Sequence, residues 1–244
     1  MIRKNIPNFI TCLNVASGSF AVLFAVKGEL TISVIFIIAA TIFDFFDGMT
    51  ARLLKAYSPM GKELDSLADM ISFGLAPGAL MMVMMEYGLF GINVRAESFT
   101  ALSLWEISCI SASLLIPVFS ALRLAKFNID TRQTDSFIGL PTPANALFIA
   151  ALALICEHGK YEALDAFILQ PVVLLLITVT MSLLLVSELP MFSLKLKNLS
   201  WSNNKVRFIF LAVSAALILA FNIYGIAAAI MTFILISIFL KVKG

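Results

Sequence analysis

LTISVIFIIAATIFDFFDGMTARLLKAYSPMGKELDSLAD, residues 30–69, begins as an apolar run long enough to cross a membrane and ends among aspartates. Asp44 and Asp47 lie inside this apolar run, and Asp65 and Asp69 lie at the start of the next one. A carboxylate at membrane depth costs roughly 2.5–3.5 kcal/mol even on the lenient insertion scale, so four cost about 10 kcal/mol. The sequence therefore predicts that these charges are compensated, most simply by divalent cations.

The composition of the whole chain indicates a membrane protein. Of its 244 residues, 61% are hydrophobic and 13% are charged, whereas soluble domains are about half apolar and a quarter charged. Apolar runs long enough to cross a bilayer as helices recur along the chain. We expect an all-α, polytopic integral membrane helical bundle with about eight transmembrane helices. The expected spans are 8–26, 30–56, 61–88, 101–127, 142–157, 168–188, 206–223 and 225–241.

The distribution of basic residues predicts the orientation. Fourteen of the 17 Lys and Arg residues fall in the set of loops and tails that includes both termini. The positive-inside rule therefore places both termini in the cytoplasm and supports an even number of spans. At 1.5 Å per residue, Asp44 lies about 9 Å from the cytoplasmic side of the bilayer core, and Asp65 and Asp69 about 6–12 Å. We expect all four carboxylates in one inner-leaflet layer of the cell membrane, open to the cytoplasm.

Helical spacing predicts that the carboxylates share a metal site. One face of the first helix carries Asp44, Asp47, Gly48, Ala51 and Arg52, and one face of the next carries Asp65 and Asp69. Oxygen donors without His or Cys favour Mg²⁺ or Mn²⁺, with Ca²⁺ as an alternative. Two ions would balance four carboxylates, and such a pair suits phosphoryl transfer. Gly48 and Ala51 would let a ligand approach the backbone, and Arg52 can hold a phosphate. The alternative for Gly48 and Ala51 is close helix packing, and the alternative for Arg52 is a positive-inside anchor.

The pattern D-x2-D-G-x2-A-R-x8-G-x3-D-x3-D is similar to the hallmark of the CDP-alcohol phosphotransferases and is matched here at every position. The resemblance implies transfer of a phosphatidyl group from a CDP-linked lipid to an alcohol, with release of CMP. It implies Asp44, Asp47 and Asp65 as metal ligands, and Asp69 as both a ligand and the catalytic general base. The CDP-binding residues that it implies are Asn8, Thr11, Gly48, Arg52 and Ser58. It also implies a homodimer.

Three further stretches resemble the phosphatidylserine synthase branch of that family: DSLADMISFGLAP (65–77), RLAKFN (123–128) and GLPTPAN (139–145). This resemblance implies CDP-diacylglycerol and L-serine as substrates, at a membrane, without a nucleic-acid partner. Because serine carries a carboxylate, Arg123 and Lys126, with Asn128 beside them, are candidates to bind it or a donor phosphate. Positive-inside anchoring is the alternative for the two cations. Thr142 and Pro143 predict a helix N-cap followed by proline in the first turn.

The resemblance covers about residues 1–200, which we expect to form a catalytic core of six spans. Residues 201–244 are then two additional C-terminal transmembrane helices without a motif. A sibling enzyme that uses glycerol 3-phosphate or inositol is an alternative for the acceptor. A membrane prenyltransferase also uses aspartates and Mg²⁺, but its motifs lack the D-G-x2-A-R element. An ion-coupled transporter with intramembrane carboxylates is expected to show broken helices or internal symmetry, and neither is evident in the sequence.

Overall fold

The computed structural model describes residues 2–96, 98–130, 137–192 and 201–241, which are almost entirely helical. Among these residues, five helical segments are long and apolar enough to cross a membrane. They are Asn5–Val26, Leu30–Leu53, Pro59–Phe90, Leu104–Ile129 and Asn204–Phe221. A sixth span is obtained if the bent pair Glu162–Ile168 and Pro171–Val186 crosses as one unit. The protein is therefore a polytopic membrane helical bundle with five or six candidate spans.

Each of the eight expected spans corresponds to helix in the structure, but not every helix has full length. Thr142–His158 and Ile223–Phe239 are apolar helices that are shorter than the other spans. A break lies at the start of the expected span 168–188, because Pro171 begins a new helix at an angle of 61° to the helix that ends at Ile168. Proline fits the first turn of a helix but not its interior, which explains where this break falls.

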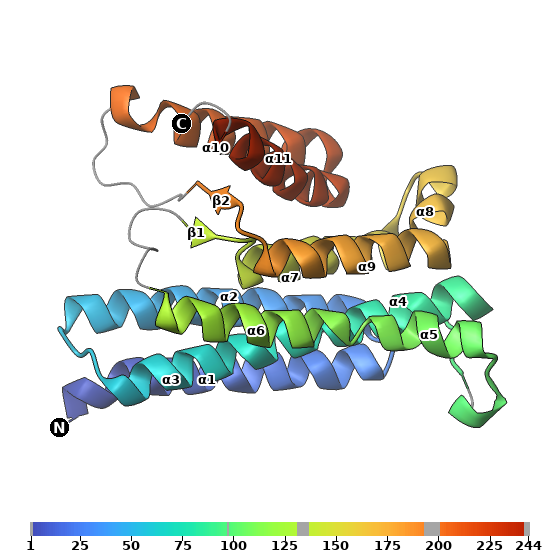
Figure 1. Ribbon diagram of the computed structural model, residues 1–244, viewed down its shortest axis with the longest axis horizontal. Helices are drawn as coiled ribbons and strands as arrows, with labels where there is room; N and C mark the ends of the chain where they lie inside the picture. The colour runs from blue at the N-terminus through green and yellow to red at the C-terminus, as the bar shows by residue number, and fades with distance from the viewer. Residues whose placement is uncertain (1, 97, 131–136, 193–200, 242–244) are drawn as a thin grey trace.

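Most of the helices run roughly along a common axis, and they stack in three layers (Figure 1). The first layer contains α1 (Ile2–Val26), α2 (Leu30–Leu53), α3 (Pro59–Asp69), the π-helix η1 (Met70–Leu75), α4 (Ala76–Phe90), the 3₁₀ helix η2 (Phe99–Ala101), α5 (Leu104–Ala112) and α6 (Leu115–Ile129). The second contains β1 (Phe137–Ile138), α7 (Thr142–His158), α8 (Glu162–Ile168), α9 (Pro171–Val186) and β2 (Pro190–Met191), and β1 pairs antiparallel with β2. The third is the hairpin of α10 (Trp201–Phe221) and α11 (Ile223–Lys241).

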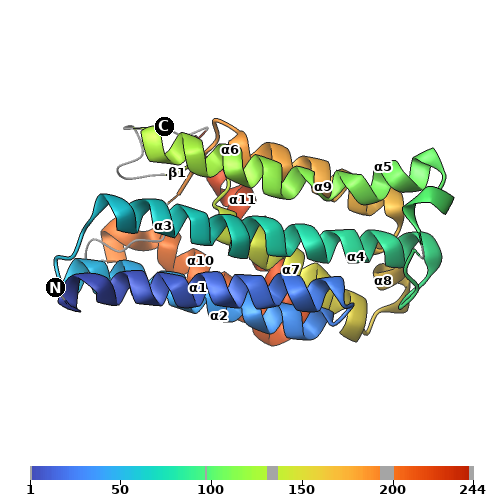
Figure 2. The same ribbon diagram turned by 90° about the horizontal axis from the view of Figure 1, so that it is seen from below.

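The continuous rod of α3, η1 and α4 forms the centre of the first layer, between α1 and α6 (Figure 2). In the apolar 18-residue stretch of this span 67% of the residues are buried, a larger share than in the corresponding stretch of the other four spans. Its core side chains include Leu80, Met81, Met84 and Met85, all fully buried. Methionine is flexible and fills irregular gaps between helices. The rod therefore provides a packed support for the aspartates at its beginning.

Close contacts fix how α6 lies along this rod. The amide Nδ2 of Asn128 donates to the hydroxyl of Ser66 at 2.9 Å. Further along, a Cβ built on Gly74 would lie only 3.1 Å from Cβ of Ser120. α6 therefore runs antiparallel to the rod, and this register places Arg123 level with Asp69.

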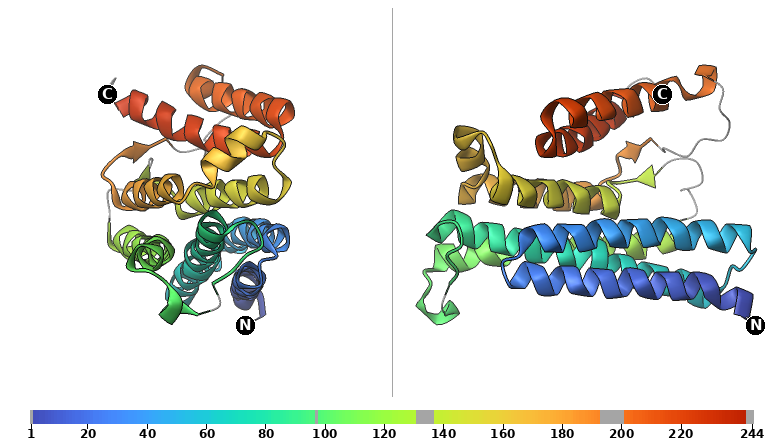
Figure 3. Two further views of the ribbon diagram at one scale, coloured as in Figure 1. Left: turned by 90° about the vertical axis from the view of Figure 1, so that its right-hand side faces the viewer. Right: turned by 180° about the vertical axis from the view of Figure 1, so that it is seen from behind.

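The α10–α11 hairpin contains the least buried of the five full-length spans, since only 11% of the α10 span is buried. It packs through α11 against α7, and it forms the outermost layer in the end-on view (Figure 3). At one end, the Tyr224 hydroxyl donates to Asp165 Oδ1 at 2.6 Å. Towards the other, the rings of Phe192, Phe210 and Phe233 contact one another, with centroids 4.9–5.8 Å apart. Contacts at both ends thus attach the hairpin to the bundle.

Candidate active site and metal centre

Three carboxylates from two helices meet near the C-terminal end of α2. Asp44 and Asp47 of α2 and Asp65 of α3 each offer one oxygen, and these oxygens lie within 4.8 Å of one another. Asp69, one turn after Asp65, lies beside Asp44 but outside this group of three. The two helices therefore bring their aspartates together, as the spacing predicts.

The donor set fits a divalent metal ion. Asp47 is only 4% exposed, and Oδ2 of Asp47 and Oδ1 of Asp69 are buried without a hydrogen-bond partner. Buried carboxylate oxygens are costly unless something binds them. A set made of oxygens alone favours hard cations such as Mg²⁺, Mn²⁺ or Ca²⁺. The residues present are therefore suited to the divalent metal expected from the sequence.

The connection from α2 to α3 is short and tightly folded. α2 ends at Leu53, and Lys55 then adopts a positive φ of 51°. Ser58 caps α3, since its Oγ accepts a hydrogen bond from the Gly61 N–H at 3.0 Å. A Cβ on Gly61 would lie 3.0 Å from both Ser58 Oγ and Asn8 Oδ1. Glycine at this position therefore allows α1 to approach the start of α3.

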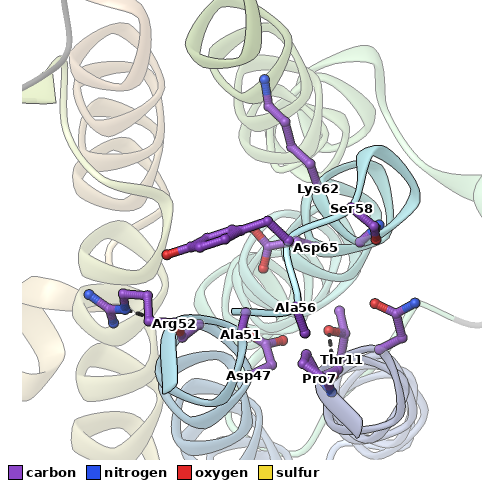
Figure 4. A pocket seen from close by; sticks show the side chains of 13 residues that line it. Pro7, Thr11, Asp47, Ala51, Arg52, Ala56, Ser58, Lys62 and Asp65 are labelled. Carbon is purple, nitrogen blue, oxygen red and sulfur yellow. Dashed lines mark hydrogen bonds between the residues drawn. The ribbon is translucent and has the colours of Figure 1, made fainter. Parts of the chain in front are cut away.

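A cavity of about 390 Å³ opens between α1, the end of α2 and the start of α3 (Figure 4). It is lined by Pro7, Asn8, Thr11, Asp47, Gly48, Ala51, Arg52, Ala56, Tyr57, Ser58, Gly61, Lys62 and Asp65. All five residues expected to bind CDP line it, together with two of the clustered aspartates. Its size lies within the usual range of small-molecule sites, about 300–1,000 Å³.

Gly48 and Arg52 show how the cavity wall is built. A Cβ on Gly48 would meet only Arg52 Nη2, at 3.9 Å. Close helix packing is therefore not the reason for glycine at position 48, and the free space lies on the cavity side. Arg52 Nε donates to the Gly48 carbonyl at 2.9 Å, and its guanidinium extends away from Asp47 (Figure 4).

Four residues that line the cavity were not singled out from the sequence: Pro7, Ala56, Tyr57 and Lys62. Only Tyr57 and Lys62 among them have polar side chains. Tyr57 is 73% exposed and lies in the connection between α2 and α3, where the sequence carried no signal for it. Lys62 was counted only as a basic residue of a cytoplasmic loop. It precedes Asp65 by three positions, and such residues share one face of a helix. That spacing was the signal that could have identified Lys62.

The π-helix η1 begins directly after Asp69 and connects the site to α1. Ser72, in η1, donates its hydroxyl to Asn14 Oδ1 at 2.6 Å. One turn earlier in α1, Thr11 donates to the Pro7 carbonyl at 3.0 Å and lies next to Asp47. π-Helical turns are rare and are frequent at functional sites. Asp69 is thus followed by a widened turn that is anchored to the helix lining the cavity.

The three residues expected to bind the acceptor do not line this cavity, and they separate into different roles. Arg123 is 6% exposed, its Nε has no hydrogen-bond partner, and its guanidinium interacts electrostatically with Asp69. Lys126 forms an exposed ion pair with Glu188. The side-chain amide of Asn128 donates to Ser66, and its backbone carbonyl accepts a hydrogen bond from Lys62. Only Arg123 therefore combines burial, charge and proximity to Asp69.

The stretch GLPTPAN (139–145) leads into α7, and the expectation that Thr142 is the N-cap of this helix is wrong. Pro141, not Thr142, occupies the N-cap position, and the helix begins at Thr142 with no side-chain cap. The backbone of Pro141 is extended, with φ −60° and ψ 137°, so Pro141 lies just outside the helix. Pro143 lies in the first turn as expected. Thr142 and Asn145 are buried, at 1% and 0% exposure.

Comparisons with known proteins agree with this site. Residues 4–186 match the family model described as CDP-alcohol phosphatidyltransferase. A CDP-diacylglycerol–serine O-phosphatidyltransferase from Helicobacter pylori is 34% identical over 163 residues, which are 65% of this chain and 60% of that protein. The enzyme of that name from Bacillus subtilis is 33% identical over 184 residues, 75% of this chain and 88% of the relative. An archaetidylserine synthase from Methanothermobacter thermautotrophicus is 32% identical over 175 residues, covering 71% of this chain and 67% of the relative.

The match thus spans less than two thirds of the Helicobacter protein but most of the Bacillus one. The family model covers the cavity, all four aspartates and the helices up to the end of α9. The chain belongs to the CDP-alcohol phosphatidyltransferase family.

Proposed function

We propose that this protein transfers the phosphatidyl group of CDP-diacylglycerol to the hydroxyl of L-serine, giving phosphatidylserine and CMP. The observation that carries the proposal is the cluster of three carboxylates at a cavity of about 390 Å³. The names of the Helicobacter and Bacillus relatives specify serine as the acceptor, which supports the same choice here. A role in phospholipid biosynthesis follows from this reaction.

The cavity is the proposed site for the CDP part of the donor. Asn8, Thr11 and Ser58 offer polar groups for the nucleotide, and Gly48 leaves room for it beside the backbone of α2. Arg52 supplies positive charge for the diphosphate. The acyl chains stay in the bilayer, which the apolar surface of the helices contacts.

Asp44, Asp47, Asp65 and Asp69 would hold the divalent metal, for which we expect two ions, Mg²⁺ or Mn²⁺, with Ca²⁺ as an alternative. When bound, the metal neutralises charge on the diphosphate and on the departing CMP. Oxygen donors from two helices and the unpartnered oxygens of Asp47 and Asp69 support this assignment.

Asp69 is the proposed general base. Its carboxylate takes the proton of the serine hydroxyl as the serine oxygen attacks the lipid-side phosphorus. A phosphorus–oxygen bond to serine forms while the bond from that phosphorus to the bridging oxygen breaks, and this oxygen leaves with CMP. The carboxylate of Asp69 has two oxygens, so one can bind the metal while the other receives the proton.

The proposed topology has eight spans, with both termini and the active site at the cytoplasmic side of the cell membrane. It counts the short helices α7 and α11 and the bent α8–α9 pair as crossings. α1 begins and α11 ends at the same end of the bundle (Figure 1), which fits an even number. Residues 1–200 would be the catalytic core and residues 201–244 an added hairpin. The homodimer is a further prediction, which the mass of the protein in detergent would test.

The test is a reaction of purified protein with CDP-diacylglycerol and a panel of alcohols: serine, glycerol 3-phosphate, inositol and choline. We expect phosphatidylserine and one equivalent of CMP with serine alone. Product with glycerol 3-phosphate and none with serine would overturn the acceptor assignment. Absence of CMP release with every alcohol would overturn the transferase assignment and leave the carboxylates to an ion-coupled transporter.

A further inference from the structure

Most of the buried polar groups without hydrogen-bond partners lie in the first two layers of helices, near the depth of the carboxylate cluster. Among the residues that the structure describes, the side chains that contain such atoms are Asn14, Asp47, Asp69, Ser120, Arg123, Thr142, Asn145, Ser182 and Ser214. Asn145 is the extreme case, because it is fully buried and neither Oδ1 nor Nδ2 is bonded. Proteins pair about nine in ten such groups, so a cluster of unpaired ones indicates a binding site.

The depth of Asn145 follows from a contact at the far end of α7. The carboxylate of Glu157 accepts hydrogen bonds from the first backbone N–H groups of α2, including that of Leu30 at 3.2 Å. From this contact α7 and α2 extend together towards the site. Asn145 lies about 18 Å from Glu157 along α7, and Asp44 about 21 Å from Leu30 along α2. Asn145 therefore lies at the depth of Asp44, and α7 also packs against η1.

Helices α6 and α9 bring two further unpartnered hydroxyls to this depth. Ser120 lies against Gly74 of η1, five residues after Asp69. The ion pair of Lys126 with Glu188 aligns α6 with the end of α9, which places Ser182 level with Ser120. None of the polar residues contributed by α6, α7 and α9 lines the nucleotide cavity.

The charge at this depth restricts what can bind there. α7 and α9 contain no Lys or Arg, and of the two cations of α6, Lys126 is paired with Glu188. Arg123 is thus the buried cation that these three helices contribute. One guanidinium beside Asp69 matches a ligand with a single carboxylate better than a dianionic phosphate. The amide of Asn145 offers both an acceptor and two donors, which suits an ammonium group next to a carboxylate.

We propose that these side chains form the acceptor subsite, and that Asn145 and Arg123 together select a small alcohol carrying both a carboxylate and an ammonium group. Arg123 binds the carboxylate, and Asn145 Oδ1 accepts from the ammonium. The hydroxyls of Ser120, Thr142 and Ser182 replace water around the bound molecule. This inference rests on the proposed transfer to serine and adds the residues that recognise it.

The test is Asn145→Leu in the full-length protein, because leucine has a similar volume and no polar atoms. We expect the KM for serine to rise about 10- to 100-fold, as for loss of a hydrogen bond to a charged group. The KM for CDP-diacylglycerol should stay unchanged. The thermal midpoint measured without serine should not fall. Thr142→Val is the second variant, with a several-fold rise in the KM for serine. Ser214→Ala removes an unpartnered hydroxyl of α10 and is the control, with no change expected.

Serine binding gives a second readout, since a ligand that binds only the folded state raises the thermal midpoint. Serine should stabilise the wild-type protein and stabilise Asn145→Leu much less. The proposed subsite is wrong if both variants keep the wild-type KM for serine. It is also wrong if only Thr142→Val folds and this variant keeps the wild-type KM. In either case the transferase assignment stands. If the wild-type protein makes no phosphatidylserine but uses another alcohol, the proposed function fails first and takes the serine subsite with it.

Discussion

The two ends of the bundle differ in how they treat buried polar groups. At the closed end, defined by Glu86, Arg95 and Glu157, these groups are paired: Glu86 pairs with Arg95, and Glu157 accepts from the first N–H groups of α2. The open end is defined by the four aspartates and the unpartnered residues of α6, α7 and α9. Many buried polar groups there have no hydrogen-bond partner. There the oxygens Asp47 Oδ2 and Asp69 Oδ1 bond to no other group of the protein.

This difference separates residues that stabilise the fold from residues kept for ligands. A satisfied buried pair stabilises the folded state, whereas an unsatisfied group costs its full desolvation free energy. Active sites retain such groups at the expense of stability. Substitutions at the two ends should therefore have opposite signatures: loss of activity at the open end, and loss of stability at the closed end.

Metal removal should give the largest effect, and only at the open end. We expect a chelator to abolish phosphatidyl transfer, with recovery on addition of Mg²⁺ or Mn²⁺, because the metal neutralises charge on the diphosphate. The thermal midpoint should also fall, since the metal binds the folded protein. Turnover and thermal unfolding in matched buffers are the measurements. Full turnover after chelation would contradict the metal assignment of the four aspartates.

Asp69→Asn should give the next largest effect. Loss of a general base lowers turnover by about 10²–10⁴-fold. In chelator the same variant should be more stable than wild type, because it removes one of several like charges held close together. Serine incorporation into lipid and the thermal midpoint test both parts. Glu63→Gln, an exposed acid on the same helix, is the control and should change neither. Near-normal turnover of Asp69→Asn would sink the base assignment.

The carboxylate cluster could be predicted from the sequence because it depends on two regular quantities, helical rise and membrane thickness. Counting residues from each bilayer face placed Asp44 and Asp65 in one layer, and the structure brings their carboxylates together. The expected CDP-binding residues, all of which line the cavity, came from the family resemblance. Lys62 did not, because it stands at an unspecified position of the family motif.

Contacts between distant segments could not be predicted in this way. Asn128 was a candidate for the acceptor site, and nothing in the sequence indicated that its amide donates to Ser66, 62 residues away in sequence. Thr142 was expected to cap α7, but Pro141 already occupies the cap position. Helical periodicity did not identify Asn145 as a candidate either. That its side chain has no hydrogen-bond partner can be seen only when α2, η1 and α7 are packed together.

Glu86→Gln should show the signature of the closed end. Glu86 is 4% exposed and pairs with Arg95, which also donates to the Val26 carbonyl at 2.9 Å. Loss of the charge should cost about 1.5–3 kcal/mol of stability, with turnover per folded protein unchanged. Thermal unfolding and a serine-dependent assay on the same sample measure both. Glu29→Gln, exposed at the same end, is the control, with an effect within about 0.5 kcal/mol. A fall in turnover without loss of stability would break the comparison between the two ends.

Tyr224→Phe should give the smallest effect, confined to the C-terminal hairpin. The Tyr224 hydroxyl donates to Asp165 at 2.6 Å and accepts from the N–H of Lys160 at 2.8 Å. Its loss should cost about 1 kcal/mol and speed amide hydrogen exchange in α10 and α11, because it removes a contact that holds the hairpin against α8. Tyr161→Phe keeps the ring that packs on Tyr224 and is the matched control. Exchange in the rod and serine transfer should stay at wild-type levels, since the hairpin supplies no residue of the nucleotide cavity. If Tyr224→Phe instead slowed transfer as much as it loosened the hairpin, residues 201–244 would be part of the catalytic unit, and the proposed division of the chain at residue 200 would be wrong.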